Sequence, residues 1–198
     1  MSYIITIGRQ YGSGGRFIAQ ELAKELGIPF YDNELLAKAA VQGGLDEDIV
    51  KSYDEKKDGV FAGFIPSLYG YDMTMGQKVF LAQFEAIKHI AEQGSAVIVG
   101  RCADYVLRDN ENVVSVFITA PINDRVARAV KYYNIEEKKA EDLIRKTDKK
   151  RASYYNFYTD RKWAHADNYD LTINSSVGIQ EAVDVIKSFA AKKLKKDL

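Results

Sequence analysis

A glycine-rich segment is the part of this sequence best suited to bind phosphate. Residues 8–16 read Gly-Arg-Gln-Tyr-Gly-Ser-Gly-Gly-Arg and follow a short β-branched run at residues 3–7. Glycines let successive backbone N–H groups turn toward a polyphosphate, and a helix that follows offers the positive end of its dipole. A cation at the end of the loop would neutralise phosphate oxygens. We therefore predict that a nucleoside triphosphate binds through Gly12, Ser13, Gly14, Gly15 and Arg16.

The loop departs from the usual phosphate-loop pattern, G-x4-G-K-[ST]. It contains no lysine, and Phe17 stands where a Ser or Thr would follow the cation. A dinucleotide-binding G-x-G-x-x-G motif is one alternative, since residues 12–14 read Gly-Ser-Gly, but Phe17 again occupies a position that needs glycine. A glycine-rich turn without a ligand is the other alternative that the residues leave open.

Two further pairs of charged side chains could act on phosphates. Arg101 and Asp104 follow the apolar run 96–99. A planar guanidinium there could clamp a phosphate or a base edge, and the alternative is a surface ion pair. Arg125 and Arg128 are three residues apart, so they share a helical face that either contacts phosphate or is solvated.

A basic stretch at residues 138–151 carries Arg145, Asp148 and Arg151 at three-residue spacing. A mobile basic helix that closes over phosphates would stabilise the transferred group and exclude water. The alternative is a solvated helix, the usual meaning of a charge run. An aromatic cluster lies downstream and could stack a base or simply pack: Tyr154, Tyr155, Tyr158 and Trp163.

Alternating strands and helices must position these residues. Apolar and β-branched runs predict five strands, at residues 3–7, 29–31, 96–99, 113–119 and 169–174. Helical spacing predicts helices at residues 18–26, 46–57, 80–91, 122–130, 136–155 and 179–194. This order predicts a mostly parallel sheet with helices on both faces, which binds ligands outside the carboxyl ends of its strands. Four residues of interest are expected at those ends: Gly8, Asp32, Arg101 and Thr119.

Composition limits the function classes. The chain has 198 residues and a formal net charge of +0, which favours neither nucleic acid nor an anionic membrane as partner. No apolar run approaches membrane-spanning length. Cys102 is the only cysteine and no secretory signal is visible, so we expect a cytoplasmic protein with a buried structural cysteine. His89 and His165 lack partners at metal-ligand spacing. Homo-oligomerisation stays open.

The sequence resembles the cytidylate kinase-like proteins, relatives of bacterial cytidylate kinase among the P-loop nucleoside monophosphate kinases. The resemblance runs through nearly the whole chain, and its most specific parts are residues 5–16 and Gly100-Arg101. The element Asp148-Lys149-Lys150-Arg151 is similar to the D-x-x-R element of the lid in that family. Residues 46–76, where acceptor selection would be expected, match least.

The resemblance implies a P-loop NTPase fold, a three-layer α/β/α domain over residues 1–198 with a five-stranded sheet. It also implies a helical acceptor-binding insertion at about 33–93 and a helical lid at about 134–160. The implied activity is transfer of the γ-phosphoryl group of ATP, with Mg2+, to a small acceptor, in the first place CMP or dCMP. The alternatives are an ATP-binding regulatory protein without turnover and a kinase of a non-nucleotide metabolite.

The resemblance also implies roles for individual residues. The residues expected to act in catalysis are Arg16, Arg145, Asp148 and Arg151. Those expected to bind ATP are Gly12, Ser13, Gly14, Gly15, Arg16, Arg125 and Arg128. Those expected to hold the acceptor are Asp32, Arg101 and Asp104. Magnesium would be carried by ATP, with Ser13 and Asp32 as the candidates to contact it.

Overall fold

The computed structural model of this chain describes residues 2–35 and 75–197. The predicted helix at 46–57 and much of the predicted insertion at 33–93 lie outside these ranges. Within them, no helix is long and apolar enough to cross a membrane.

A parallel sheet forms the centre of the described structure. Its strands are β1 (Ile4–Arg9), β2 (Phe30–Tyr31), β3 (Ala96–Val99), β4 (Val113–Thr119) and β5 (Leu171–Asn174). They lie in the order β2-β3-β1-β4-β5, and each described pairing is parallel. All five predicted strands are confirmed. The last one begins at Leu171 rather than at residue 169, so Tyr169 precedes the strand.

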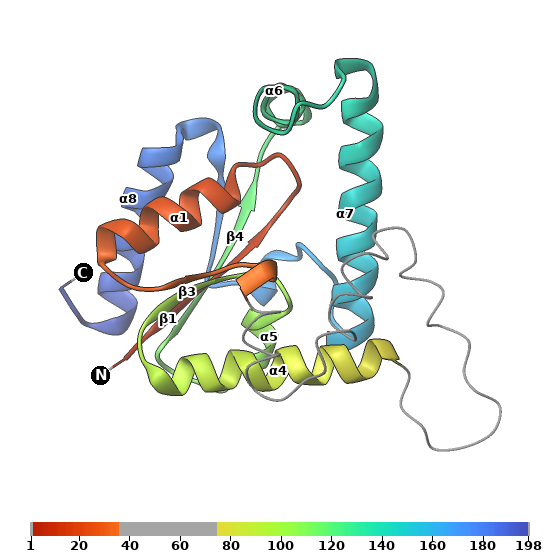
Figure 1. Ribbon diagram of the computed structural model, residues 1–198. Helices are drawn as coiled ribbons and strands as arrows, with labels where there is room; N and C mark the ends of the chain where they lie inside the picture. The colour runs from red at the N-terminus through yellow and green to blue at the C-terminus, as the bar shows by residue number, and fades with distance from the viewer. Residues whose placement is uncertain (1, 36–74, 198) are drawn as a thin grey trace, which may run out of the picture.

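Helices cover both faces of this sheet, as predicted (Figure 1). On one face, α1 (Gly15–Leu26) and α8 (Ile179–Leu194) pack against the strands through a core that includes Ile5, Leu22 and Ile186. On the other face, α4 (Met75–Gln93) and the short α5 (Ala103–Val106) pack through Ile87 and Ile98. Because the central strands β1, β3 and β4 have consecutive buried residues and so are covered on both sides, the sheet needs a layer of helices on each face.

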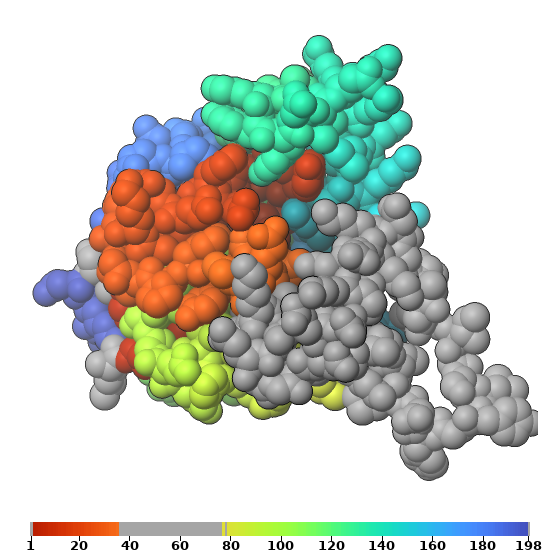
Figure 2. Space-filling view, viewed as in Figure 1, coloured from red at the N-terminus to blue at the C-terminus, as the bar shows by residue number. Residues whose placement is uncertain are grey.

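Two helices lie beyond the carboxyl ends of the strands. Helix α6 (Ile122–Tyr133) and helix α7 (Glu137–Thr159) share a small apolar cluster around Ile144 that also contacts Tyr11 of the glycine-rich loop (Figure 1). In the space-filling view, the red-to-orange surface of the N-terminal part of the chain, which includes α1, lies between the yellow-green surface of α4 and the teal surface of α6 (Figure 2). Helix α7 occupies the region predicted as the lid and extends four residues past the predicted end at 155.

A glycine of the loop is required by both conformation and space. Gly12 has φ 76°, and a Cβ there would lie 2.7 Å from the Arg125 carbonyl oxygen. We expect Gly12→Ala to lower the free energy of unfolding by about 1–3 kcal/mol, because the backbone is strained and helix α6 must shift. Gly94→Ala is the matched control, since a Cβ at Gly94 meets nothing within 4 Å. Urea unfolding of both variants compares them, and an equal loss would contradict this account.

Candidate active site

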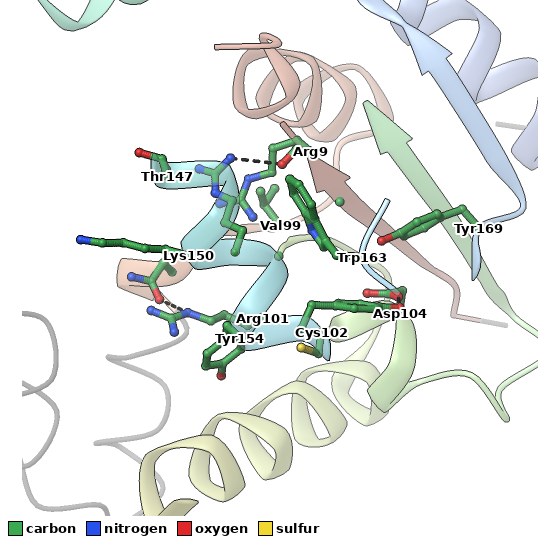
Figure 3. A pocket seen from close by; sticks show the side chains of 15 residues that line it. Arg9, Val99, Arg101, Cys102, Asp104, Thr147, Lys150, Tyr154, Trp163 and Tyr169 are labelled. Atoms are coloured by element: carbon green, nitrogen blue, oxygen red, sulfur yellow. Dashed lines mark hydrogen bonds between the residues drawn. The ribbon is translucent and has the colours of Figure 1, made fainter. Parts of the chain in front are cut away.

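A pocket of about 400 Å³ opens at the carboxyl ends of β1 and β3. Gly8 and Arg9 line it from β1, residues 99–102 line it from β3 and the turn after it, and residues 147–155 of α7 contribute one wall (Figure 3). The lining is completed by Asn33, Asp104, Trp163 and Tyr169. The pocket therefore lies where a parallel sheet is expected to bind its ligand.

Three arginines converge on this pocket from separate elements: Arg9, Arg101 and Arg151. Arg151 Nη1 donates a hydrogen bond of 3.1 Å to the Arg9 carbonyl oxygen. The Arg101 Nε donates to Asn33 Oδ1, and its guanidinium lies over the Tyr154 ring. Burial, reinforced by the other two guanidinium groups, lowers the pKa of Arg9 well below its usual range. Burial also lowers the pKa of Arg151.

A strained turn directs Arg101 into the pocket. Gly100, Arg101 and Cys102 have φ values of 76°, 55° and 57° in succession. Left-handed conformations of non-glycine residues cost free energy and cluster at ligand sites. Cys102 is buried beneath this turn, and burial raises the pKa of its thiol, so it is a structural cysteine as predicted rather than an activated one.

The glycine-rich loop is held by a clamp of three residues. Asp148 Oδ1 of α7 accepts a hydrogen bond of 2.8 Å from the Tyr11 N–H. Arg125 Nε of α6 donates a hydrogen bond of 2.7 Å to the Tyr11 carbonyl oxygen, and Arg125 also pairs with Asp148. Arg125 is buried, so the alternative of a solvated face is wrong for this residue. The clamp fixes both backbone groups of one loop residue.

Gly12 and Gly14 of the loop lie beneath α6 and α8, and neither they nor Gly15 line the pocket. Gly12, Gly14 and Gly15 are buried, and a Cβ at Gly14 would lie 2.9 Å from Ile179. The first turn of α1 nevertheless has no acidic residue and no side-chain cap. Beside Gly14, Arg128 donates one hydrogen bond to the Ser175 carbonyl oxygen, while its Nη1 is buried without a partner.

The uncapped N-terminus of α1 and the Arg128 side chain are chemically suited to bind a polyphosphate. Unbonded N–H groups at a helix N-terminus attract anions, and a buried unpartnered guanidinium nitrogen needs an acceptor. The residues suited to hold ATP are thus Gly14, Gly15, Arg16 and Arg128. The described residues contain no group of three or more acidic, histidine or cysteine side chains that could hold a metal ion.

The two candidates for contacting magnesium are already engaged. The Ser13 hydroxyl is buried and donates to the Gln10 carbonyl oxygen. Asp32 pairs with Arg16 at 2.7 Å and accepts hydrogen bonds from the N–H groups of Glu34 and Leu35, as a helix cap does. Their predicted contact with magnesium stays a prediction.

A half-buried carboxyl, that of Asp104, lies on the opposite side of the pocket from Arg9 and Arg101 (Figure 3). Asp104 accepts a hydrogen bond of 2.7 Å from the Tyr155 hydroxyl, rather than forming the surface ion pair considered above. Burial raises the pKa of Asp104. Burial and the nearby Asp104 also raise the pKa of Tyr155 and Tyr169.

The structure gathers some predicted residues and separates others. Arg101, Asp104 and Arg151 line one pocket, whereas Arg145 is exposed and donates to Glu141 on its own helix. The catalytic role of Arg145 stays a prediction. Sequence reasoning missed Arg9 as a site residue, although it lies two positions after the apolar run that ends at Ile7 and is the last residue of β1.

The sequence profile of the cytidylate kinase-like family matches residues 4–177. The chain belongs to the cytidylate kinase-like family. An uncharacterized protein from Eubacterium ventriosum, with a solved structure, is 33% identical and has a TM-score of 0.75, covering 95% of this chain and 98% of its own. No curated protein matches the chain.

More distant kinases share the fold. Shikimate kinase from Bacteroides thetaiotaomicron has a TM-score of 0.56 at 16% identity and covers 95% of this chain and 98% of its own. A gluconokinase from Sinorhizobium meliloti has a TM-score of 0.59 at 13% identity and covers 98% of this chain and 94% of its own. The predicted P-loop kinase fold is confirmed. Membership of the cytidylate kinase-like family supports an ATP-dependent phosphotransferase that acts on a small molecule, with use of ATP and usually Mg2+.

The clamp on Tyr11 is expected to contribute to stability. Asp148→Asn removes the charge opposite Arg125, whose side chain is only 8% exposed, and an unpaired buried charge costs about 3–5 kcal/mol. Urea unfolding measures the loss. Glu141→Gln on the same helix breaks only an exposed pair, for which about 1 kcal/mol or less is expected. Equal losses in the two variants would refute the clamp.

Asp104 makes a distinct contribution to the pH dependence of stability. A carboxyl whose pKa is raised on folding binds its proton more tightly in the native state. Its contribution to stability is therefore present at low pH and is lost as pH rises from the unfolded pKa of about 3.9 through the raised native pKa. Unfolding of wild type and Asp104→Asn across this range measures the difference. The free energy of unfolding of Asp104→Asn should increase relative to that of wild type as pH rises. A difference between the two proteins that does not change with pH would contradict the raised pKa of Asp104.

Proposed function

We propose that this protein transfers the γ-phosphoryl group of ATP to a nucleoside monophosphate, in the first place CMP or dCMP. The observation that carries the proposal is the pocket itself, in which cationic groups and aromatic rings face one enclosed space. A nucleoside monophosphate combines an anion with a flat ring, and the two kinds of lining match these two parts. The single cysteine also fits a cytoplasmic protein.

The acceptor is proposed to lie with its phosphate toward Arg101 and Arg151 and its base toward the aromatic side. On that side, Tyr155 and Tyr169 line the pocket next to Asp104. Asp104 could accept a hydrogen bond from an exocyclic amino group or donate one when protonated, so it is suited to discriminate between bases. This arrangement supports cytidylate over an acceptor without a ring.

ATP is proposed to bind on the other side of the loop, at the N-terminus of α1. Gly14, Gly15 and Arg16 would hold the polyphosphate, and Arg128 would gain the acceptor that its buried nitrogen lacks. Arg16 would exchange part of its pairing with Asp32 for phosphate oxygens, which its half-exposed side chain allows. When bound, Mg-ATP supplies the phosphoryl group, and the metal neutralises charge on the phosphates.

Arg151 is the residue best placed to stabilise the transferring group. It lines the acceptor pocket and also bonds to the backbone of the loop, so it spans the two proposed binding sites. Phosphoryl transfer depends mainly on positioning and electrostatic stabilisation, and a general base is not required. Asp148 would act by positioning the loop through Tyr11. Arg145 would join only if it left Glu141.

Two other functions would use the same fold and are distinguished by the assay described below. Gluconokinase and shikimate kinase share the fold and act on metabolites that are not nucleotides, so a metabolite acceptor is the second candidate. An ATP-binding regulator without turnover is the third. The converging arginines of the pocket favour an enzyme that handles a second anion over such a regulator.

The test is phosphoryl transfer by the purified protein with Mg-ATP and a panel of CMP, dCMP, UMP, AMP, gluconate and shikimate. We expect transfer to CMP or dCMP. In Arg151→Gln, kcat should fall about a hundredfold or more with a smaller effect on ATP binding, because the lost contact acts on transition-state charge. Lys149→Gln, an exposed neighbour on α7, is the control.

The same panel separates the rivals. Transfer only to gluconate or shikimate would sink the cytidylate assignment. ATP binding without transfer to any acceptor would favour the regulator. Loss of ATP affinity in Arg151→Gln with unchanged kcat would contradict the role given to Arg151.

A further inference from the structure

We propose that Arg9 is the principal binding residue of a phosphate-specific site in the pocket, a role that neither the phosphate-loop motif nor the family resemblance gives it. Its ligand class is a tetrahedral dianion, the phosphate group of the acceptor. The inference deepens the proposed function and rests on it for the identity of the acceptor, whereas the phosphate site itself rests on geometry alone.

The Arg9 guanidinium lies close to other cations, and no described residue is its hydrogen-bond or ion-pair partner. Among the residues that the structure describes, it forms no hydrogen bond and no salt bridge, although it lines the pocket. Its nearest acidic influence is Asp32, which is already bonded to Arg16 and to two backbone N–H groups. Arg9 is half-buried, and a guanidinium that is partly removed from water without a counter-ion is costly, so it is retained where a ligand supplies the missing charge.

The surrounding backbone is shaped to admit this side chain. A Cβ on Gly100 would overlap Arg9 Nη1 and lie 3.1 Å from Arg9 Cζ, so only glycine leaves room for the guanidinium. A Cβ on Gly15 would lie 2.7 Å from Arg9 Cβ. The Arg9 stem thus packs between two glycines, and its charged end has a fixed position. Such preorganisation is typical of a binding group.

The charge around Arg9 specifies the class of anion. Arg101 and Arg151 line the same pocket, and each acts on Arg9 by lowering its pKa, as two like charges close by must do. A carboxylate carries one charge on two coplanar oxygens, and one guanidinium fork is enough to satisfy it. Three guanidiniums from β1, the turn after β3, and α7 are better matched by a phosphate, which carries up to two charges and three acceptor oxygens.

The test uses inorganic phosphate as the probe and thermal unfolding of the full chain as the readout. Ionic strength is held constant with sodium chloride, so that screening alone cannot shift the midpoint. Wild type is compared with Arg9→Met, which keeps the stem that packs on Gly15, and with Arg9→Lys, which keeps the charge but loses the fork. Arg108→Met is the matched control, because Arg108 lies outside the pocket and pairs with Asp109.

We expect phosphate to raise the unfolding midpoint of wild type and of Arg108→Met. Without phosphate, Arg9→Met should be more stable than wild type, since it removes a half-buried charge that has no counter-ion among the described residues. The dissociation constant for phosphate should be about ten- to a hundredfold higher in Arg9→Met than in wild type, the loss expected for charged hydrogen bonds. The dissociation constant of Arg9→Lys should lie between these two values. A purely structural role for Arg9 would instead lower the stability of the ligand-free variant.

Three results would overturn the proposal: no phosphate effect on wild type, an unchanged phosphate effect in Arg9→Met, or an Arg9→Met variant that is destabilised or does not fold. The outcome is separable from that of the kinase assay. Phosphate binding that depends on Arg9, found together with no transfer to any acceptor, would uphold this site and reject the proposed activity. Transfer to CMP by an Arg9→Met variant with a wild-type KM would reject this site and uphold the activity.

Discussion

Two side chains of α7 bond to the backbone of the segment where β1 ends, and the pocket depends on this attachment. Asp148 accepts from the Tyr11 N–H, and Arg151 donates to the Arg9 carbonyl oxygen. These bonds bring a helix from late in the chain against the first strand, where its side chains form one wall of the pocket. Arg125 strengthens the attachment by bonding to Tyr11 and pairing with Asp148. Loop conformation and pocket shape are therefore set by the same contacts.

The charge distribution at this edge of the sheet explains why such an attachment is needed. Burial lowers the pKa of both Arg9 and Arg151, which means that the protein without a ligand holds these cations at a cost. The backbone turn through Arg101 and Cys102 adds strain. A bound anion would relieve the electrostatic part of this cost. The same unneutralised arginine charges would therefore destabilise the empty site and favour the binding of phosphate. A carboxyl with raised pKa, Asp104, stands apart from the cations and can serve base recognition.

Features that depend on a local sequence pattern were predicted correctly, whereas contacts between residues far apart in the sequence were not predicted. Apolar runs such as Ala96–Val99 identified the strands, and Arg101 was predicted as a site residue because it follows one of them. The direction of Arg9 depends on the space above Gly100, ninety-one positions away, which no spacing rule reveals. Asp148 was predicted to act in catalysis from its spacing to Arg151, yet its contacts hold Tyr11, 137 positions earlier. The glycines of the loop were predicted as ligand contacts, which stays a prediction, whereas the structure shows that Gly12 and Gly14 are needed for packing beneath α6 and α8.

The central claim is that the arginine-lined pocket holds the phosphate of the acceptor. It is tested most directly by a crystal structure of the protein with CMP, magnesium and a non-hydrolysable ATP analogue. The account predicts the CMP phosphate within hydrogen-bond distance, roughly 2.7–3.2 Å, of the guanidinium groups of Arg9, Arg101 and Arg151. It also predicts the base against the aromatic wall of the pocket. Density for CMP at another place, with these three arginines still facing an empty pocket, would contradict it.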